Sequence, residues 1–246
     1  MKKVRTIARL DIKGENLIKS INLEGLKKIG NPGEFAKKYY NEKIDELIFI
    51  DTVATLYGRN QLRDILIEAS KEIFVPITIG GGIRTLEDAE KSFMAGADKV
   101  FINSQAVQNP KFISELSRKF GSQSIVVNIE VKKFDNNKWE VFITNGRDRT
   151  GIEIIDWMKK CESLGAGELM ITSIDNEGTG NGSDLELLNL AQDATKLPLI
   201  YSGGIGSLQD IKNLDKIKID GLALSRVLHY NLLNIKEIKQ ALNYSS

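Results

Sequence analysis

The sequence contains almost no histidine or cysteine. Of its 246 residues, His229 is the one histidine and Cys161 the one cysteine. A single cysteine cannot form an internal disulfide and fits a reducing compartment, so we expect a cytoplasmic protein. One histidine and one cysteine cannot build a His/Cys zinc site. With no nucleotide-binding glycine fingerprint or Walker motif either, we expect no metal and no cofactor, and we interpret both residues as packing residues.

Long apolar runs and a charge excess of one sign are also missing. No run reaches the roughly 18 apolar residues that a membrane-spanning helix requires. Arg5 and Arg9 interrupt the apolar stretch near the amino terminus, which therefore does not resemble a signal peptide. Lysine and arginine number 34 against 33 aspartate and glutamate residues, for a net charge of +1. This balance argues against nucleic acid or a membrane as a partner.

Short apolar runs alternate with amphipathic stretches along the whole chain. Such alternation predicts parallel strands connected by helices. The expected fold class is α/β, and eight repeats in 246 residues fit one (β/α)8 TIM barrel, with residues 1–246 as a single domain. The expected strands lie near residues 5–11, 46–51, 76–80, 99–102, 124–130, 168–173, 198–201 and 220–224.

The second half of the chain repeats features of the first half at a fixed distance of 122 residues. The matching pairs are Glu46 with Glu168, Gly81 with Gly203, Thr85 with Ser207, and Asn103 with Ser225. The period is too long for a solenoid repeat. It predicts two similar half-barrels related by a pseudo-twofold axis.

Two segments are longer than a barrel connection needs. Residues 12–31 follow the first strand, and we expect them to form a loop over the active end that acts as a lid. Residues 131–144 are typical of a hairpin that turns at Asp135-Asn136-Asn137.

Two carboxylates stand at the ends of strands that face each other across the predicted ring. Asp11 ends the first strand and Glu130 ends the fifth. Active sites of such barrels lie at the carboxyl ends of the strands. Two carboxyl groups there can divide the work of acid and base, so both are candidate catalytic residues. The alternative is that each carboxylate caps a helix or forms a salt bridge.

Glycine and small polar residues follow four other strands. Glycine lets a phosphate approach backbone N–H groups, and the helix that follows adds partial positive charge. The repeat doubles this feature and predicts a substrate with two phosphates, although glycines also occur in tight turns. Lys19 in the first insertion and Thr172 are further candidate ligands. The phosphate-binding candidates are Gly82, Asn103, Ser104, Gly203, Gly204 and Ser225.

Four strands begin with a charged residue. These are Arg5, Glu46, Lys99 and Glu168, which we expect at the base of the barrel. Two cations and two anions can form a neutral ring. Such a ring is either a polar plug or a gate for a small polar molecule.

Several longer stretches resemble one known family along nearly the whole chain. They are ARLDIK (8–13), IDELIFID (44–51), PITIGGGIRTLEDAE (76–90), GADKVFINSQAVQNP (96–110), FGSQSIVVNIEVKK (120–133), GAGELMITSIDNEGT (165–179) and LPLIYSGGIG (197–206). The family is HisF, the cyclase subunit of imidazole glycerol phosphate synthase. The resemblance implies a bisphosphate substrate, a phosphoribulosyl aminoimidazole-carboxamide ribonucleotide. It also implies ammonia supplied by a HisH-type glutaminase subunit, and products that are imidazole glycerol phosphate and the carboxamide ribonucleotide of purine synthesis.

The same resemblance implies roles for individual residues. Asp11 and position 130 correspond to the catalytic aspartates of the family. Asp98 corresponds to a position that faces the glutaminase. The phosphate contacts fall on Lys19, Gly82, Asn103, Gly204 and Ser225, and the ammonia gate falls on Arg5, Glu46, Lys99 and Glu168.

Three departures from the family pattern leave alternatives open. Position 130 holds glutamate instead of aspartate, Asn128 replaces a small residue, and the loop near Asn176-Glu177 differs. A specialised HisF-like subunit that supplies ammonia for amidation of a bacterial surface sugar is one alternative. The phosphoribosyl isomerase that precedes HisF in the pathway is another.

Overall fold

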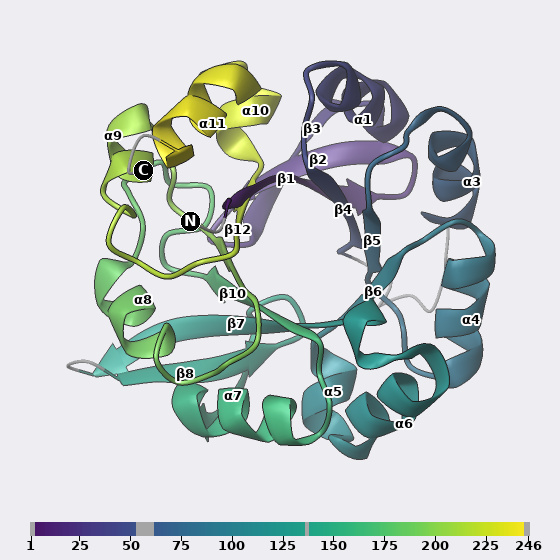
Figure 1. Ribbon diagram of the computed structural model, residues 1–246, viewed down its shortest axis with the longest axis vertical. Coiled ribbons are helices and arrows are strands. Elements are labelled where there is room, and N and C mark those ends of the chain that lie inside the picture. The colour runs from purple at the N-terminus through teal and green to yellow at the C-terminus, as the bar shows by residue number, and fades with distance from the viewer. Residues whose placement is uncertain (1–2, 53–61, 136–137, 244–246) are drawn as a thin grey trace.

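A computed structural model describes residues 3–52, 62–135 and 138–243. Parallel strands form a closed ring with helices outside it (Figure 1). Because β10 pairs with both β11 and β7, the ring has no open edge. In ring order the strands are β1 (Arg5–Lys13), β4 (Glu46–Asp51), β5 (Ile77–Gly80), β6 (Lys99–Ile102), β7 (Ile125–Asp135), β10 (Glu168–Ser173), β11 (Leu199–Ser202) and β12 (Gly221–Leu224). The predicted (β/α)8 barrel is confirmed.

The outer layer consists of short helices. A 3-10 turn over Ser122–Ser124 comes directly before β7. The helices are α1 (Pro32–Asn41), α3 (Leu62–Glu72), α4 (Leu86–Met94), α5 (Ser104–Gln108), α6 (Lys111–Phe120), α7 (Ile154–Ser163), α8 (Leu185–Ala191), α9 (Leu208–Lys212), α10 (Arg226–His229) and α11 (Ile235–Asn243). Among the described helices, none is long and apolar enough to cross a membrane.

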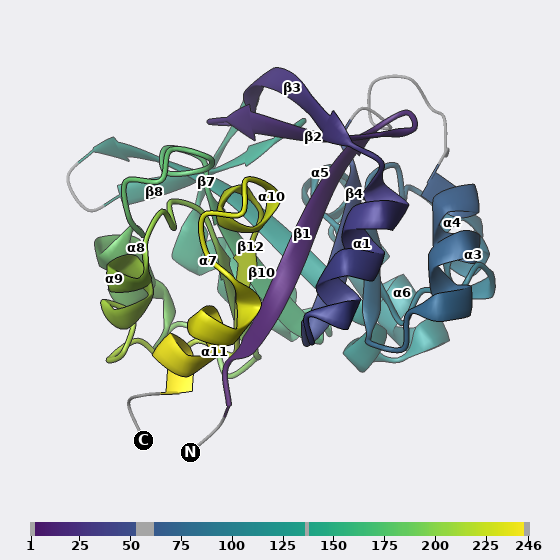
Figure 2. The same cartoon turned by 90° about the horizontal axis from the view of Figure 1, so that it is seen from above.

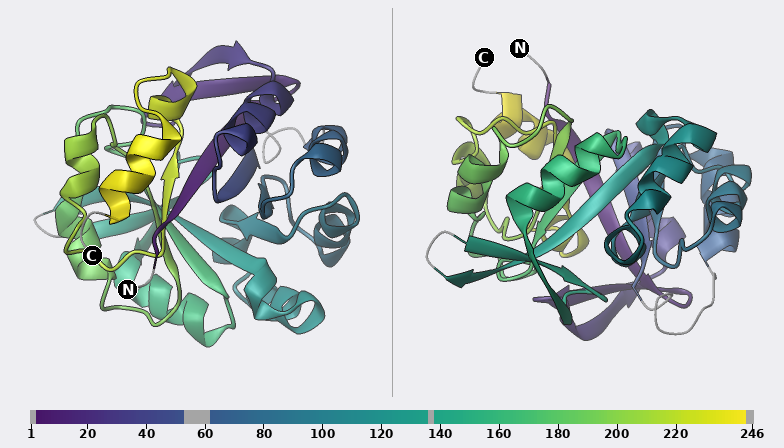
Figure 3. Two further views of the ribbon diagram at one scale, coloured as in Figure 1. Left: turned by 45° about the horizontal axis from the view of Figure 1, so that its top comes forward. Right: turned by 90° about the horizontal axis from the view of Figure 1, so that it is seen from below.

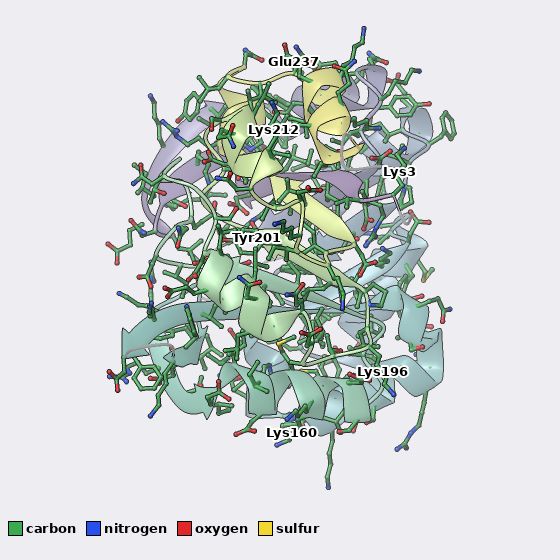
Figure 4. All side chains as sticks on the ribbon, turned by 60° about the vertical axis from the view of Figure 1, so that its left-hand side comes forward. Lys3, Lys160, Lys196, Tyr201, Lys212 and Glu237 are labelled. Carbon is green, nitrogen blue, oxygen red and sulfur yellow. The ribbon has the colours of Figure 1, made fainter. Side chains whose placement is uncertain are left out.

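Two apolar regions stabilise the barrel. The larger one lies between the outward faces of the strands and the helices, and the smaller one fills the interior. Successive side chains of a strand point to opposite faces, so alternate residues of β1 enter the interior. Charged side chains such as Lys160 and Lys196 lie at the outer surface, whereas Tyr201 is buried in the larger cluster, between the strands and the helices (Figure 4). The interior cluster consists of Ile7, Ile48, Ile50, Phe101, Val126, Met170, Ile200 and Ala223.

The prediction of a loop over residues 12–31 was wrong, because most of these residues form strands. β1 continues to Lys13 and pairs antiparallel with β2 (Asn16–Ile21), which pairs with β3 (Glu24–Gly30). This β2–β3 hairpin lies at one end of the barrel, opposite the end where β1 begins (Figure 2). Strand pairing satisfies the backbone groups of a segment that would otherwise extend into solvent.

The second predicted hairpin is confirmed. β7 continues beyond the ring and pairs antiparallel with β8 (Lys138–Ile143), which pairs with β9 (Asp148–Glu153). Residues 136–137 of its predicted turn lie outside the described residues. Both hairpins extend from the same end of the barrel (Figure 3). They explain why the first and fifth strands run past the ends that the sequence predicted.

The two halves repeat in local detail, which confirms the predicted duplication. Thr85 and Ser207 begin α4 and α9 with the same capping box, in which the hydroxyl accepts from a backbone N–H and an aspartate accepts in return. Asn103 and Ser225 share an unusual backbone conformation before their short helices, with ψ of −85° and −69°.

Candidate active site

Asp11 and Glu130 face each other across the interior of the barrel. β1 and β7 are separated by β4, β5 and β6 on one side and by β10, β11 and β12 on the other, so they are opposite in the ring. The two residues are buried, at 2% and 6% exposure, at the end that carries the hairpins. Both strands continue past the carboxylates, which therefore lie inside the mouth rather than at the strand ends.

Arg9 lies in the barrel interior next to Asp11, and the sequence analysis did not include it in the site. Its Nε donates to Oδ1 of Asp11 at 2.9 Å, and one terminal nitrogen donates to the hydroxyl of Ser202 at 3.2 Å. Burial alone would lower the pKa of Arg9, but the carboxylates of Asp11 and Glu177 outweigh it and raise the pKa. The guanidinium therefore remains charged inside the barrel.

Glu177 links this interior pair to the hairpin. Its Oε2 lies 3.6 Å from Nη1 of Arg9, and its Oε1 accepts from Nζ of Lys19 on β2. Burial alone would raise the pKa of Glu177, but the nearby cations Lys19 and Arg9 lower it to about 2. In this conformation Lys19, predicted as a phosphate ligand, is buried in a salt bridge with a carboxylate.

Glu130 lies in a different electrostatic environment. Burial is the largest effect and raises the pKa of Glu130 to about 7, although Arg9 acts to lower it. Its Oε2 accepts from the backbone N–H of Gly146 at 2.8 Å, and the Asn103 side chain also donates to the carboxyl group. A carboxyl with a pKa near neutrality can deliver or accept a proton at physiological pH.

A cavity of about 80 Å³ opens beside Glu130. Three predicted phosphate-binding residues, Gly82, Asn103 and Ser104, line it. Gly81 has φ of +93°, and a Cβ there would lie 2.2 Å from the carbonyl oxygen of Asp51, so the turn requires glycine. Oδ1 of Asn103 is buried without a hydrogen-bond partner in the described part of the chain, which leaves an acceptor for a ligand hydroxyl.

A smaller cavity of about 20 Å³ lies in the other half of the barrel. The remaining predicted phosphate-binding residues, Gly203, Gly204 and Ser225, line it together with Glu177 and Arg226. Such a volume accommodates about one water molecule.

Thr172 lies apart from both cavities. Its hydroxyl donates to Oδ1 of Asn128 at 2.9 Å inside the barrel. Asn128, a departure from the family pattern close to Glu130, lines the first cavity and pairs with Thr172. The contacts that fix Glu130 come from Gly146 and Asn103 instead.

The four charged residues at the strand starts form a closed ring of salt bridges at the base. Nη1 of Arg5 donates to Oε2 of Glu46 at 2.6 Å, and Nη2 donates to Glu168. Nζ of Lys99 lies 3.0 Å from each of the same two glutamates. Asp98, next to Lys99, is exposed at this end and accepts from a backbone N–H of β5.

His229 and Cys161 are both buried, as expected of packing residues. Nδ1 of His229 lies 2.7 Å from the hydroxyl of Tyr39, between α10 and α1. Burial lowers the pKa of His229 to about 3 and raises the pKa of Cys161 to about 12. Neither residue is poised for acid–base or thiolate chemistry at neutral pH.

A closed (β/α)8 barrel with buried titratable groups and glycine-lined cavities at one end has the arrangement of a barrel enzyme. A family model described as "Histidine biosynthesis protein" matches residues 5–234. The chain belongs to this family, in its HisF branch, which confirms the predicted resemblance.

Three relatives named imidazole glycerol phosphate synthase subunit HisF show the extent of the similarity. The protein of Legionella pneumophila is 52% identical over 210 residues, 85% of this chain and 99% of that protein. That of Dictyoglomus thermophilum is 42% identical over 238 residues, 97% of this chain and 94% of that protein. That of Lactococcus lactis subsp. cremoris strain MG1363 is 41% identical over 240 residues, 97% and 93% of the two chains.

Proposed function

We propose that the chain is the cyclase subunit of imidazole glycerol phosphate synthase. It converts phosphoribulosyl aminoimidazole-carboxamide ribonucleotide and ammonia into imidazole glycerol phosphate and the carboxamide ribonucleotide, in the cytoplasm. Asp11 and Glu130 act as the acid–base pair for ring closure and cleavage. The proposed reaction requires no metal or cofactor.

The observation that carries the proposal is the position of the two carboxyl groups between two glycine-lined cavities. Asp11 is paired with Arg9, whereas burial raises the pKa of Glu130 to about 7. Two carboxyl groups in such unequal environments are suited to opposite proton-transfer roles. One cavity for each phosphate would place the reacting part of the substrate over the barrel centre, between these two groups.

Binding of the two phosphates is assigned to the two cavities. Gly82, Asn103 and Ser104 would hold one phosphate, and Gly203, Gly204 and Ser225 the other. In each half a glycine turn and the first residues of a helix bring backbone N–H groups toward the ligand. Lys19 would join the second phosphate when Glu177 releases it. Thr172 donates its hydroxyl proton to Asn128, and its hydroxyl oxygen would accept a hydrogen bond from the substrate.

We also propose that a HisH-type glutaminase subunit docks at the base of the barrel. Ammonia would enter there through the ring of Arg5, Glu46, Lys99 and Glu168 and pass the apolar interior. Asp98 would face the partner. Two large apolar side chains on this end, Phe74 and Met94, are 77% and 81% exposed. Large exposed apolar side chains at one end of a molecule favour a protein contact there.

The experiment is steady-state turnover of the purified chain with the phosphoribulosyl substrate and excess ammonium salt. Formation of both products in equal amounts supports the cyclase. Asp11→Asn should abolish it, and Lys160→Met on the exposed face of α7 serves as the matched control.

A second candidate function is ammonia supply to another amidation reaction, such as that of a surface sugar. The observation that favours it is the closed ring of salt bridges at the base, which an ammonia-conducting barrel needs whether or not it converts the bisphosphate. In that case the chain stimulates its glutaminase partner without converting the bisphosphate. Glutaminase and cyclase rates measured in the same complex separate the two functions.

A further inference from the structure

Four charged side chains are buried together at the barrel mouth. They are Lys19, Glu177, Arg9 and Asp11, each at most 4% exposed. Lys19 pairs with Glu177, Glu177 lies 3.6 Å from Arg9, and Arg9 donates to Asp11 at 2.9 Å. The four residues therefore form an unbroken series of ion pairs from the β2–β3 hairpin to a candidate catalytic carboxylate.

The series contains two cations and two anions, so it is neutral as a whole. A buried charge is strongly unfavourable unless it is paired. Arg9 has two carboxylate partners, and Lys19 neutralises one of them. Without Lys19, Glu177 and Asp11 would have to share the single guanidinium of Arg9.

Lys19 pairs with Glu177 in the docked arrangement of the β2–β3 hairpin. The hairpin contacts the loop after β10 through Asn22, whose backbone N–H donates to the carbonyl oxygen of Glu177 at 2.7 Å. The Asn22 side chain also donates to the carbonyl oxygens of Ile174 and Asp175, at 2.9 and 2.8 Å. Docking of the hairpin and pairing of Lys19 with Glu177 are therefore parts of the same closed arrangement.

We propose that Arg9 is a positioning residue that couples docking of the β2–β3 hairpin to the placement of Asp11. This inference rests on the proposed function and deepens it. With the hairpin docked, the Arg9 guanidinium holds the Asp11 carboxyl group in place at the barrel mouth. Among the described residues no salt bridge reaches Glu130, which is left to act as the acid.

The first test measures hydrogen exchange of residues 16–30 in the full chain. Arg9→Met and Lys19→Met should each accelerate exchange in this hairpin by roughly tenfold, while exchange in β4 and β5 stays unchanged. Because both substitutions act through Glu177, exchange of the hairpin in the double variant should be only slightly faster than in the faster of the two single variants. Arg118→Met, on the exposed face of α6, is the control.

Two outcomes of the exchange experiment would overturn the coupling. One is an additive effect of the two substitutions, which would mean that Arg9 and Lys19 act independently. The other is accelerated exchange throughout the barrel, which would mean that Arg9 only supports the fold. Neither readout requires turnover, so the coupling is tested even if the proposed cyclase function fails.

The second test measures kcat and KM for turnover with ammonium salt. Arg9→Met should lower kcat by roughly 100-fold with little change in KM, because a small displacement of a catalytic group has such an effect. Arg9→Lys keeps a cation beside Asp11 and should restore part of kcat. An unchanged kcat in Arg9→Met, or a loss that appears in KM alone, contradicts the positioning role.

Discussion

Arg9 and Asp11 lie two residues apart on β1 and form a buried salt bridge, with 2.9 Å between Nε and Oδ1. Because alternate residues of a strand share one face, this spacing places both side chains inside the barrel. Glu130, on the opposite strand, is buried and forms no salt bridge with any residue that the structure describes. The two carboxyl groups of the site therefore differ in their environment rather than in their chemistry.

Glu130→Gln should stabilise the protein at alkaline pH but not at acid pH. The folded-state pKa of Glu130 is raised to about 7 by burial. The folded state thus favours the protonated carboxyl, and the stability that this contributes is present below the unfolded value of about 4.3 and is lost as pH rises to about 7. The variant cannot ionise, so it should exceed the wild type by up to about 3 kcal/mol at pH 8.

Urea unfolding of both proteins at pH 4 and pH 8 measures this difference. Glu140→Gln is an unsuitable control because that carboxyl pairs with Arg149, whereas Glu115→Gln on the exposed face of α6 is suitable. Equal stability of Glu130→Gln and the wild type at pH 8 would show that Glu130 is not a raised-pKa group.

The alkaline limb of cyclase activity should reflect the same residue. If Glu130 acts as the acid, turnover falls as pH rises above about 7, because the carboxyl loses its proton. Rates must be expressed per unit of free ammonia, whose own concentration rises with pH. A rate that is independent of pH between 6 and 9 on this scale would assign the acid to another group.

The two cavities should contribute separately to substrate affinity. Asn103→Ala and Ser225→Ala remove one polar side chain from each cavity and should each raise KM for the bisphosphate by about tenfold. The sites lie in different halves of the barrel, so the double variant should raise KM by about 100-fold. A KM that responds to one substitution alone would mean that the substrate occupies a single cavity.

Lys99→Met should impair glutamine-driven turnover more than ammonium-driven turnover. Lys99 lies 3.0 Å from both Glu46 and Glu168, so its removal leaves two carboxylates opposing one arginine at the base. We expect the ratio of glutamine-driven to ammonium-driven rates to fall by about tenfold, whereas Lys119→Met on the outside of α6 leaves it unchanged. An unchanged ratio in Lys99→Met would indicate a polar plug rather than a gate.

The exposed apolar side chains at the base should contribute to partner binding. Phe74→Ser should weaken association with the glutaminase subunit at least tenfold, as expected of a large side chain at an interface. Phe134→Ser provides the matched control, because Phe134 is 51% exposed on β7 near the opposite end. Calorimetric titration measures both. Equal affinity of Phe74→Ser and the wild type would place the partner elsewhere.

The sequence predicted the barrel because its signals are local and repeated. Each strand is a short apolar run, and the 122-residue repeat relates features such as Thr85 and Ser207 that cap equivalent helices. Asp11 and Glu130 could be placed because opposite strands follow from counting along the ring.

The missed features depend on contacts between distant segments. Alternation along β1 was sufficient to place Arg9 inside the barrel, but a buried arginine is acceptable only with carboxylate partners. One of these partners, Glu177, belongs to a loop in the other half of the chain. Residues 12–31 formed a hairpin rather than a loop because β2 could extend the pairing of β1. No local sequence pattern predicts the small volume of the second cavity.

Turnover of the phosphoribulosyl substrate by the purified chain, with excess ammonium salt and no partner, distinguishes a cyclase from a barrel that only supplies ammonia. For a cyclase, imidazole glycerol phosphate and the carboxamide ribonucleotide appear together in equal amounts, and Asp11→Asn and Glu130→Gln each abolish both. Binding of the bisphosphate without formation of either product would contradict the cyclase function and would leave ammonia supply as the function of the barrel.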